Sequence, residues 1–281
     1  MNKELKYAIL IDADNISEKY IKIILDEAAN NGIATYKRIY GDWTNPQLTS
    51  WKRVLLDNSI IPIQQYGYTT GKSSTDSAMI IDAMDILYSG TVDGFCLASS
   101  DSDFTRLAAR LRESGMQVIG MGESKTPKPF ISACNQFKYL DILFSNKTDS
   151  EKDEAEVEKE AEMPTDSEKA PAASKKGKAV SAKRTKQKQK EPEPQTNLKM
   201  IKKAMLTLVE ECSDDDGWIF SAELGNQLAK RFPDFDVRNF GFSKFTPFIN
   251  SLGLFDVKRN QAGGNSNVKL VYFKLKDQEK K

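Results

Sequence analysis

Carboxylate side chains recur at short spacing in the N-terminal half of the chain. Asp12 and Asp14 close the run KYAILIDAD, Asp101 and Asp103 follow GFCLASS, and Asp76 opens a long apolar segment. Like charges held close together raise one another's pKa, so a folded chain tolerates them together chiefly when cations neutralise the site. Mg²⁺ and Mn²⁺ take oxygen ligands, and two such ions can activate water for phosphodiester hydrolysis. The pattern therefore predicts a divalent-metal site.

The chain contains no histidine among its 281 residues. The usual general base and the usual nitrogen ligand for zinc are both missing. Its cysteines, Cys96, Cys134 and Cys212, are far apart and odd in number, which argues against a disulfide framework or a thiolate zinc site. Any hydrolysis would have to be catalysed by carboxylates with bound Mg²⁺ or Mn²⁺. The alternative is that the chain is not an enzyme.

Each of these aspartates also has an ordinary structural explanation. Asp101 or Ser102 could cap a helix that begins near Phe104, and Asp76 or Thr75 could cap the next one, because Asp, Ser and Thr are favoured at helix N-termini. Asn15 could orient water or phosphate oxygens, or cap a helix that begins near Ser17. Taken together with Asp12, the clustering at strand ends and a helix start favours metal binding.

Two further residues carry weaker predictions. Asp82 lies nearly two turns inside an apolar helix, where an unpaired carboxylate is expensive, so we expect it to have a partner: Asn15, an arginine or the metal shell. Lys72 stands in TTGKSST, but the spacing from Gly67 to Gly71 does not fit GxxxxGK[ST]. An NTPase is rejected on that ground, and Lys72 is kept as a phosphate contact.

The elements that must position these residues alternate between strand and helix patterns. Strands are expected at residues 6–12, 33–40, 60–65, 94–98, 116–121 and 138–143, and helices at 17–30, 47–58, 75–88 and 104–113. Such alternation predicts an α/β domain with a mainly parallel sheet covered on both faces. Ligands of such sheets bind beyond the carboxyl ends of the strands, where the aspartates are placed.

Composition divides the chain into three parts: residues 1–146, 147–196 and 197–281. The middle part is rich in Glu, Lys, Ala, Pro and Ser, has almost no aliphatic residues, and is expected to be a disordered linker because it cannot bury enough apolar surface. Its first section, 149–168, is acidic and its second, 175–190, is basic. The basic section could also attract phosphates.

The chain shows no sign of a membrane partner. Residues 1–6 are charged and lead into a short apolar run, and no stretch approaches the roughly 18 apolar residues of a membrane span. With the cysteine pattern, this favours a cytoplasmic location.

The C-terminal part predicts a small α+β winged-helix domain. Helices are expected at 198–211 and 222–231, Trp218 and Phe220 open an element between them, and VRNFGFSKFTPFINSLGLFDV supplies a third helix and a strand. A Gly/Asn turn at 260–267 and a strand at 268–275 complete the wing. The phenylalanines of that stretch are interpreted as core rather than as base-stacking platforms: Phe240, Phe242, Phe245 and Phe248.

Charge on the C-terminal part permits nucleic-acid binding. Residues 197–281 carry 14 basic and 11 acidic residues, a surplus of 3. Cations supply most of the sequence-independent affinity for phosphates. The expected phosphate contacts are Arg238, Lys244, Arg259 and Lys269.

Three runs carry a resemblance to a known family: AILIDADNI, TDSAMIIDAMD and LASSDSDFTRLAARLRESGMQVIGMG. They resemble the signature blocks of NYN domains, the PIN-like group that includes LabA-type proteins, over about residues 6–145. The resemblance implies a PIN-like Rossmannoid sheet and RNA cleavage with magnesium. The acidic residues of the family fall on Asp12, Asp76, Asp101 and Asp103, with Asn15 and Asp82 in support.

The sequence departs from that family at two places. Ser100 stands where many relatives carry glycine, and SSTD stands where a KGVD-like run is usual, which bears on Lys72.

The C-terminal part, about residues 197–276, resembles an OST-HTH or LOTUS domain, which implies binding of RNA or of a protein partner. Two functions follow. The first is a metal-dependent endoribonuclease with a C-terminal RNA-binding domain. The second is a non-catalytic RNA-binding or protein-interaction regulator whose NYN domain is silent.

Overall fold

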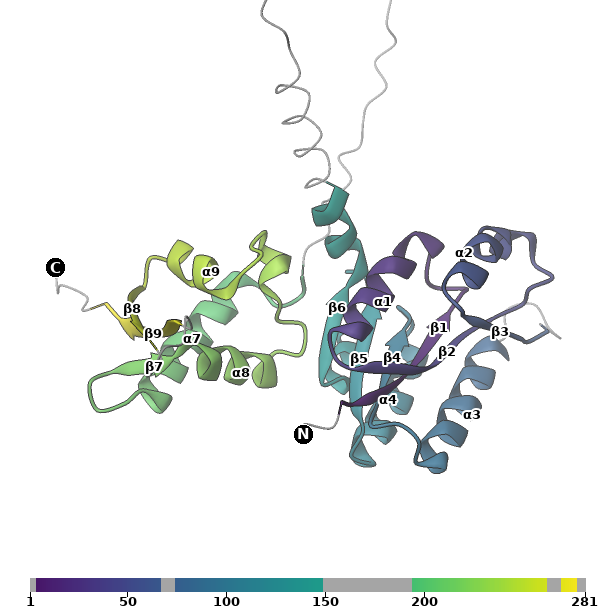
Figure 1. Cartoon of the computed structure of the whole chain (residues 1–281), viewed down its shortest axis with the longest axis horizontal. Coiled ribbons are helices and arrows are strands. Elements are labelled where there is room, and N and C mark those ends of the chain that lie inside the picture. Colours follow the sequence, from purple (N-terminus) through teal and green to yellow (C-terminus); the bar gives the residue numbers. More distant parts are fainter. Residues whose placement is uncertain (1–3, 67–73, 149–193, 262–268, 277–281) are drawn as a thin grey trace, which may run out of the picture.

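The computed structural model describes residues 4–66, 74–148, 194–261 and 269–276. Two folded bodies lie side by side, an α/β body over residues 6–148 and a smaller body of helices and strands over residues 197–276 (Figure 1). This confirms the predicted fold classes. Lys72, most of the predicted linker (149–193) and most of the predicted wing turn (262–268) lie outside the described residues.

A six-stranded sheet forms the centre of the first body, and all of its neighbouring strands are parallel. Its order is β3-β2-β1-β4-β5-β6. The strands are β1 (Lys6–Asp12), β2 (Ile33–Gly41), β3 (Ile61–Gln64), β4 (Gly94–Ala98), β5 (Gln117–Gly122) and β6 (Gln136–Tyr139). The order reverses between β1 and β4, and at such a switch point an open α/β sheet forms a crevice beyond its strand ends.

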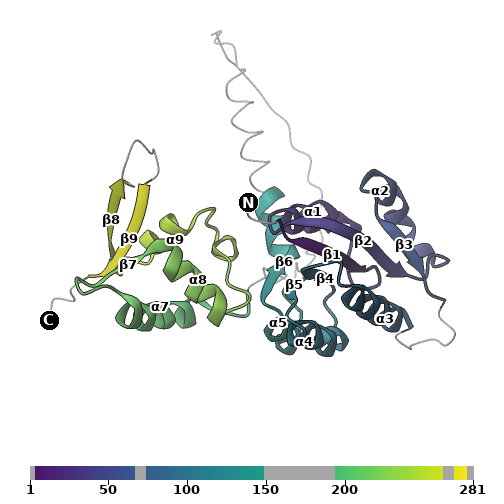
Figure 2. The ribbon, with the colours of Figure 1, turned by 60° about the horizontal axis from the view of Figure 1, so that its bottom comes forward.

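Helices cover both faces of this sheet (Figure 2). The helices are α1 (Ile21–Ala29), α2 (Lys52–Asp57), α3 (Ser74–Ser89), α4 (Thr105–Glu113) and α5 (Lys128–Ala133). One core contains side chains of α1 and α2 with Ile9 and Ile11 of β1. The other contains side chains of α3, α4 and α5 with Ala8 and Leu10. Because side chains alternate along a strand, Asp12 faces the side of α3 and α4.

The last segment of the first body differs from the prediction. The expected strand at 138–143 is wrong beyond Tyr139, because residues 140–148 are helical. Leu140 and Leu143 are buried in the α1-side core and Phe144 packs against it, a spacing of three and four residues that suits one helix face. A short apolar run fits either a strand or a helix, and here packing against the α1-side core favours the helix. Helix α5 was not predicted, and the expected helix at 47–58 is divided into a 3-10 helix, Pro46–Trp51, and α2.

In its described residues the second body contains three α-helices, a 3-10 helix (Val237–Phe240) and an antiparallel three-stranded sheet of order β7-β9-β8. Its elements are α7 (Leu198–Cys212), β7 (Trp218–Phe220), α8 (Ser221–Arg231), α9 (Phe245–Ser251), β8 (Phe255–Gln261) and β9 (Lys269–Leu275). Phe248 is fully buried, and Phe240, Phe242 and Phe245 pack against the same core, which confirms their interpretation as core residues. None of the described helices combines the length and apolar character needed to cross a bilayer.

The two bodies contact each other along the edge strand β6. The backbone N–H of Phe137 donates to the carbonyl of Pro233 at 2.8 Å. Tyr139 donates its hydroxyl to Asp234 at 2.9 Å, and Asp234 also accepts from the backbone N–H of Thr196 at 3.0 Å. The last residues of the predicted linker are therefore part of the contact between the bodies.

An ion cluster completes this contact. Arg238 donates to both carboxylate oxygens of Glu27 on α1, at 2.5 and 2.9 Å, and to Asp236. Lys138 of β6 donates to Asp236 at 2.8 Å. Burial pushes the pKa of Asp236 up, but Arg238 and Lys138 outweigh it and hold that pKa well below its usual range. Charge pairing therefore holds the second body against the first.

The ion cluster changes the interpretation of Arg238. Its guanidinium nitrogens are occupied by carboxylates at the domain contact, so its placement does not support the phosphate contact predicted for it. The bidentate geometry explains why an arginine stands there, since a planar fork matches a carboxylate.

Candidate metal centre

Asp12 lies at the carboxyl end of β1 and is fully buried. Its Oδ2 accepts hydrogen bonds from Ser99 Oγ at 2.7 Å and from Asn15 Nδ2 at 2.8 Å. Its Oδ1 accepts from the backbone N–H of Asp14 at 3.1 Å. Burial raises the pKa of Asp12 above its ordinary value, although these three hydrogen bonds favour the charged form. A cation beside this carboxyl group would stabilise its ionised state.

Asp101 and Asp103 stand just after β4, around the short 3-10 helix Ser102–Phe104. Asp101 caps this helix, because its Oδ1 accepts from the backbone N–H of Asp103 at 2.9 Å. The capping prediction is thus correct for Asp101. A capping carboxylate keeps its second oxygen for another partner, so the capping role does not exclude metal binding.

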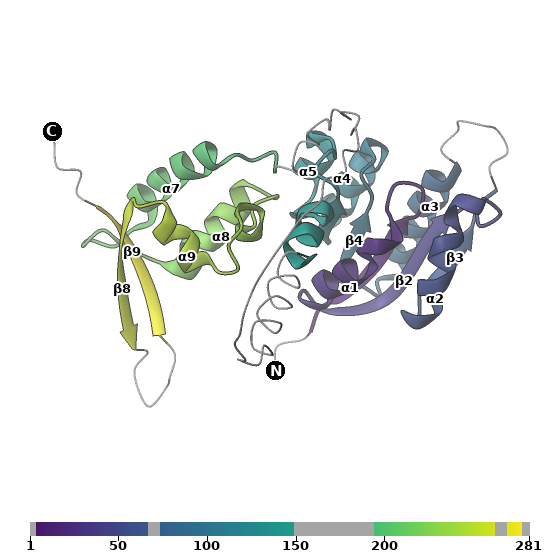
Figure 3. The same ribbon diagram turned by 90° about the horizontal axis from the view of Figure 1, so that it is seen from above.

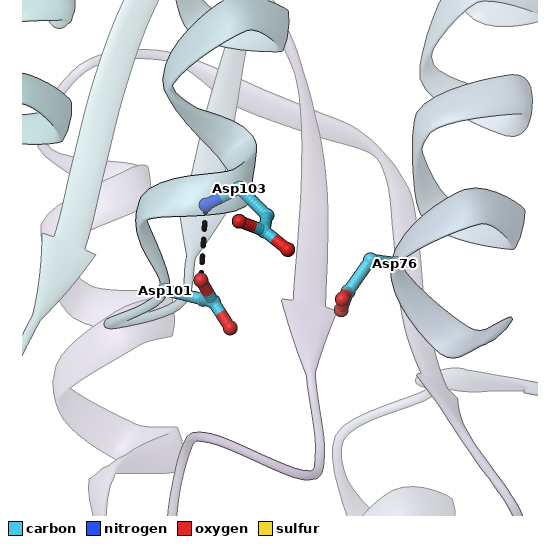
Figure 4. Close-up of side chains that lie close together, drawn as sticks. All are labelled: Asp76, Asp101 and Asp103. Atoms are coloured by element: carbon cyan, nitrogen blue, oxygen red, sulfur yellow. Dashed lines mark hydrogen bonds between the residues drawn. The ribbon is translucent and has the colours of Figure 1, made fainter. Parts of the chain in front are cut away.

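Asp76 comes to the same place from the first turn of α3 and is 8% exposed. Asp76, Asp101 and Asp103 each offer a carboxylate oxygen within 4.8 Å of the other two (Figure 4). Oxygens bound to one octahedral Mg²⁺ at about 2.1 Å are at most about 4.2 Å apart. Small side-chain rotations would therefore bring all three onto a single ion.

The donor set fits a hard divalent cation. All three groups are carboxylates, and oxygen ligands suit Mg²⁺ or Mn²⁺ rather than softer metals. Two residues after Asp103, at the first residue of α4, Thr105 Oγ1 is buried without a hydrogen-bond partner in the part of the chain that the structure describes. A buried hydroxyl without a partner costs about 1–3 kcal/mol, and a metal-bound water is a partner that would satisfy it.

Asp12 lies beside this group rather than within it. Ser99 joins the two, because its Oγ donates to Asp12 and accepts from the backbone N–H of Asp101 at 3.0 Å. The structure thus brings together three of the four aspartates predicted to bind metal, and it connects the fourth through one serine. Asp14 is exposed, and Asn15 orients the Asp12 carboxylate.

Asp82 has the arginine partner that was one of its three expected partners. Its two carboxylate oxygens accept hydrogen bonds from Arg38 and from the hydroxyl of Tyr40, both on β2. Burial, and then Asp82 itself, raise the pKa of Tyr40, so this hydroxyl remains a proton donor. These two contacts join α3 to β2 through Asp82.

The expected phosphate contacts in the second body are exposed. Lys244 precedes α9, Arg259 lies on β8 and Lys269 begins β9. Their role in binding RNA stays a prediction.

Two polar residues at this sheet edge were not predicted. One is Ser99. The other is Glu123, which follows β5, accepts the Tyr20 hydroxyl at 3.0 Å and donates its backbone N–H to Ser100 Oγ at 2.9 Å. The pairing of β1 with β4 explains why Ser99 reaches Asp12. Ala98 pairs with Ile11, so the residues that follow them, Ser99 and Asp12, are neighbours.

Substituting Asp12 by asparagine is expected to change how stability depends on pH. Because burial raises the Asp12 pKa in the folded state, the parent loses stability as pH rises from about 3.8 through the folded pKa, whereas asparagine does not titrate. The free energy of unfolding of Asp12→Asn should therefore rise relative to that of the parent as pH rises from 4 to 7. Urea unfolding in chelator across this range measures it, and a difference that does not vary with pH would contradict the assigned direction.

Comparison with known proteins finds two family models that match the chain. The NYN domain family model matches residues 6–141, and the OST-HTH/LOTUS domain model matches residues 196–266. A crystal structure of a protein of unknown function from Vibrio parahaemolyticus is similar at 18% identity and a TM-score of 0.42, covering 50% of this chain and 94% of that one. No curated protein matches the chain.

Proposed function

We propose, from the premise that this chain combines an NYN domain with an OST-HTH/LOTUS domain, that it is a metal-dependent endoribonuclease. The observation that carries the proposal is the convergence of Asp76, Asp101 and Asp103 at the switch point of the sheet. A carboxylate cluster at that position is suited to holding Mg²⁺ or Mn²⁺ against a phosphodiester.

The aspartates of the site would have two different roles. Asp76, Asp101 and Asp103 would hold the ion. A bound divalent ion supplies Lewis-acid stabilisation of the phosphoryl oxygens and a more acidic water. Asp12 is oriented by Ser99 and Asn15 and adds negative charge behind the cluster, which would strengthen cation binding.

The second body would supply affinity for RNA. Lys244, Arg259 and Lys269 are exposed, and contacts of this kind attract the phosphate backbone whatever the base sequence. Contact along β6 joins this body to the nuclease body, so RNA bound by the second body would be held on the same molecule as the carboxylate cluster.

One observation favours a second candidate function. Asp12 accepts three hydrogen bonds and lies outside the group of three, as expected for a site that no longer recruits it to a metal. The second candidate is a non-catalytic RNA-binding or protein-interaction regulator.

Incubation of the full chain with RNA and DNA oligonucleotides distinguishes the two. We expect RNA to be cut internally with Mg²⁺ or Mn²⁺ and to remain intact in chelator. RNA that is bound but never cut under any metal condition would support the regulator.

We also propose that the protein works in a reducing compartment such as the cytoplasm. Supporting this, all three cysteines are free, and burial raises the pKa of the Cys96 and Cys134 thiols to about 12. Thiols that stay protonated are poor nucleophiles for disulfide formation.

A further inference from the structure

The sheet of the second body has one face on the core and one face outward. Ile219 of β7 is paired with Phe273 of β9, and both are buried in the core. Side chains alternate along strands, so the neighbours Trp218, Phe220 and Tyr272 point to the opposite face. Such a face usually carries polar side chains where it meets water. Here it carries three aromatic rings.

These rings are accessible. Phe220 is 39% exposed, and Trp218 and Tyr272 are partly exposed. The Phe220 and Tyr272 rings lie 5.4 Å apart, centroid to centroid, and are tilted by 46°. Figure 3 and the two earlier views place this sheet at the end of the molecule remote from the nuclease body. The contact between the two bodies therefore leaves the face uncovered.

Positive charge lies among the rings. Lys258 of β8 is exposed, stands opposite Tyr272, and has its Nζ 5.6 Å from the centre of the Trp218 ring. Lys274 stands between Trp218 and Asp256 on neighbouring strands. The acidic side chains gather at one end of this face, at Asp256 and in the loop before β7, which contains Asp214, Asp215 and Asp216. An anionic ligand would therefore occupy the end formed by Phe220, Tyr272 and Lys258.

We propose that Trp218, Phe220, Tyr272 and Lys258 form a stacking surface for single-stranded RNA. Every base has a π-face, so aromatic rings on a sheet bind unpaired bases with little regard to sequence, while nearby cations contact the backbone. The choice of RNA over another single-stranded polyanion rests on the proposed function. A ligand of this face has to cover the exposed ring of Phe220 and neutralise Lys258. In RNA, flat bases would cover the ring and the phosphates that join them would neutralise the lysine.

The neighbouring cations provide an internal comparison. Arg259 and Lys269 occupy alternate positions on the same two strands, in register with the core-facing pairs, so they face away from the aromatic rings. Lys258 should therefore act together with the rings, whereas Lys269 should contribute only general attraction to phosphates.

The test measures binding of a fluorescein-labelled single-stranded RNA 12-mer to the full chain by anisotropy, in chelator and at fixed salt. Phe220→Leu with Tyr272→Leu keeps apolar bulk but removes both rings, and should raise Kd about tenfold or more, since stacking contributes about 1–3 kcal/mol per base. Tyr88→Leu, at a 73% exposed tyrosine on α3, is the matched control and should leave Kd within about twofold.

Two further measurements distinguish the loss of stacking from misfolding of the double variant. Lys258→Ala retains all rings and should weaken binding more than Lys269→Ala does. RNA should also quench tryptophan fluorescence in the parent, and this quenching should be lost in Trp218→Phe, which leaves Trp43 and Trp51 in place. An unchanged Kd in the double variant, or quenching by RNA that survives Trp218→Phe, would overturn the proposal.

The outcome is separable from that of the nuclease proposal. If the parent binds RNA through this face but never cuts it, the nuclease proposal falls and the stacking surface stands. If the double variant binds and cuts RNA as the parent does, the stacking surface falls and the nuclease proposal stands.

Discussion

Replacing Asp101 by asparagine should lower the rate of RNA cleavage by at least about two orders of magnitude, because the proposed metal site, at which water would be activated, loses a ligand. Local structure should survive, since asparagine caps a helix as well as aspartate does and its amide oxygen can still accept the Asp103 N–H. Single-turnover rates at saturating Mn²⁺ measure the effect.

The matched control for this change is Asp85→Asn, at an exposed position on α3 away from the cluster. It should cleave RNA at the rate of the parent. The RNA affinity of Asp101→Asn in chelator should stay within about threefold, because the proposed phosphate contacts are Lys and Arg side chains of the second body. An Asp101→Asn protein that cuts as fast as the parent would show that the nuclease site lies elsewhere.

Replacing Arg238 by methionine is expected to destabilise the chain by about 3 kcal/mol, the lower end of the range for breaking a buried ion pair, because Arg238 is itself 34% exposed. Glu27 is only 5% exposed and would lose both of its bonds to the guanidinium. Urea unfolding of the full chain measures this. The matched control is Arg106→Met, whose pair with Glu113 is 3.5 Å long and exposed, and which should change stability by less than about 1 kcal/mol.

The Arg238 effect should depend on pH in one direction. Arg238 and Lys138 hold the pKa of Asp236 below its ordinary value of 3.8 in the folded state. The stability from this pairing is complete above about pH 4 and is lost as pH falls toward the folded pKa. The gap between parent and Arg238→Met should therefore be largest near pH 7 and shrink in acid. A gap that widens in acid would contradict the assigned pairing.

The buried strands and the positions of the aspartates could be predicted from the sequence. KYAILID is a continuous apolar run, which a strand covered on both faces requires, and its last residue had to lie at the carboxyl edge. The alternation of strand and helix patterns, together with the expected helix N-caps, then predicted the approximate positions of Asp76 and Asp101.

Other features depended on tertiary contacts that local patterns do not encode. Residues 140–148 form a helix because Leu140, Leu143 and Phe144 pack against the α1-side core, although the same letters suit a strand. Arg238 was predicted to contact phosphate because cations supply most of the sequence-independent affinity for RNA. Its partner Glu27 is 211 residues away, a separation that no spacing rule spans.

The most direct test of the account is a crystal structure of the full chain with Mn²⁺, read from the anomalous scattering of the metal. We expect an ion at about 2.1 Å from carboxylate oxygens of Asp76, Asp101 and Asp103, the distance of such ions from oxygen ligands. A metal site at this cluster is contradicted if crystals of protein that cuts RNA with Mn²⁺ hold the ion at other residues, or hold none at this cluster.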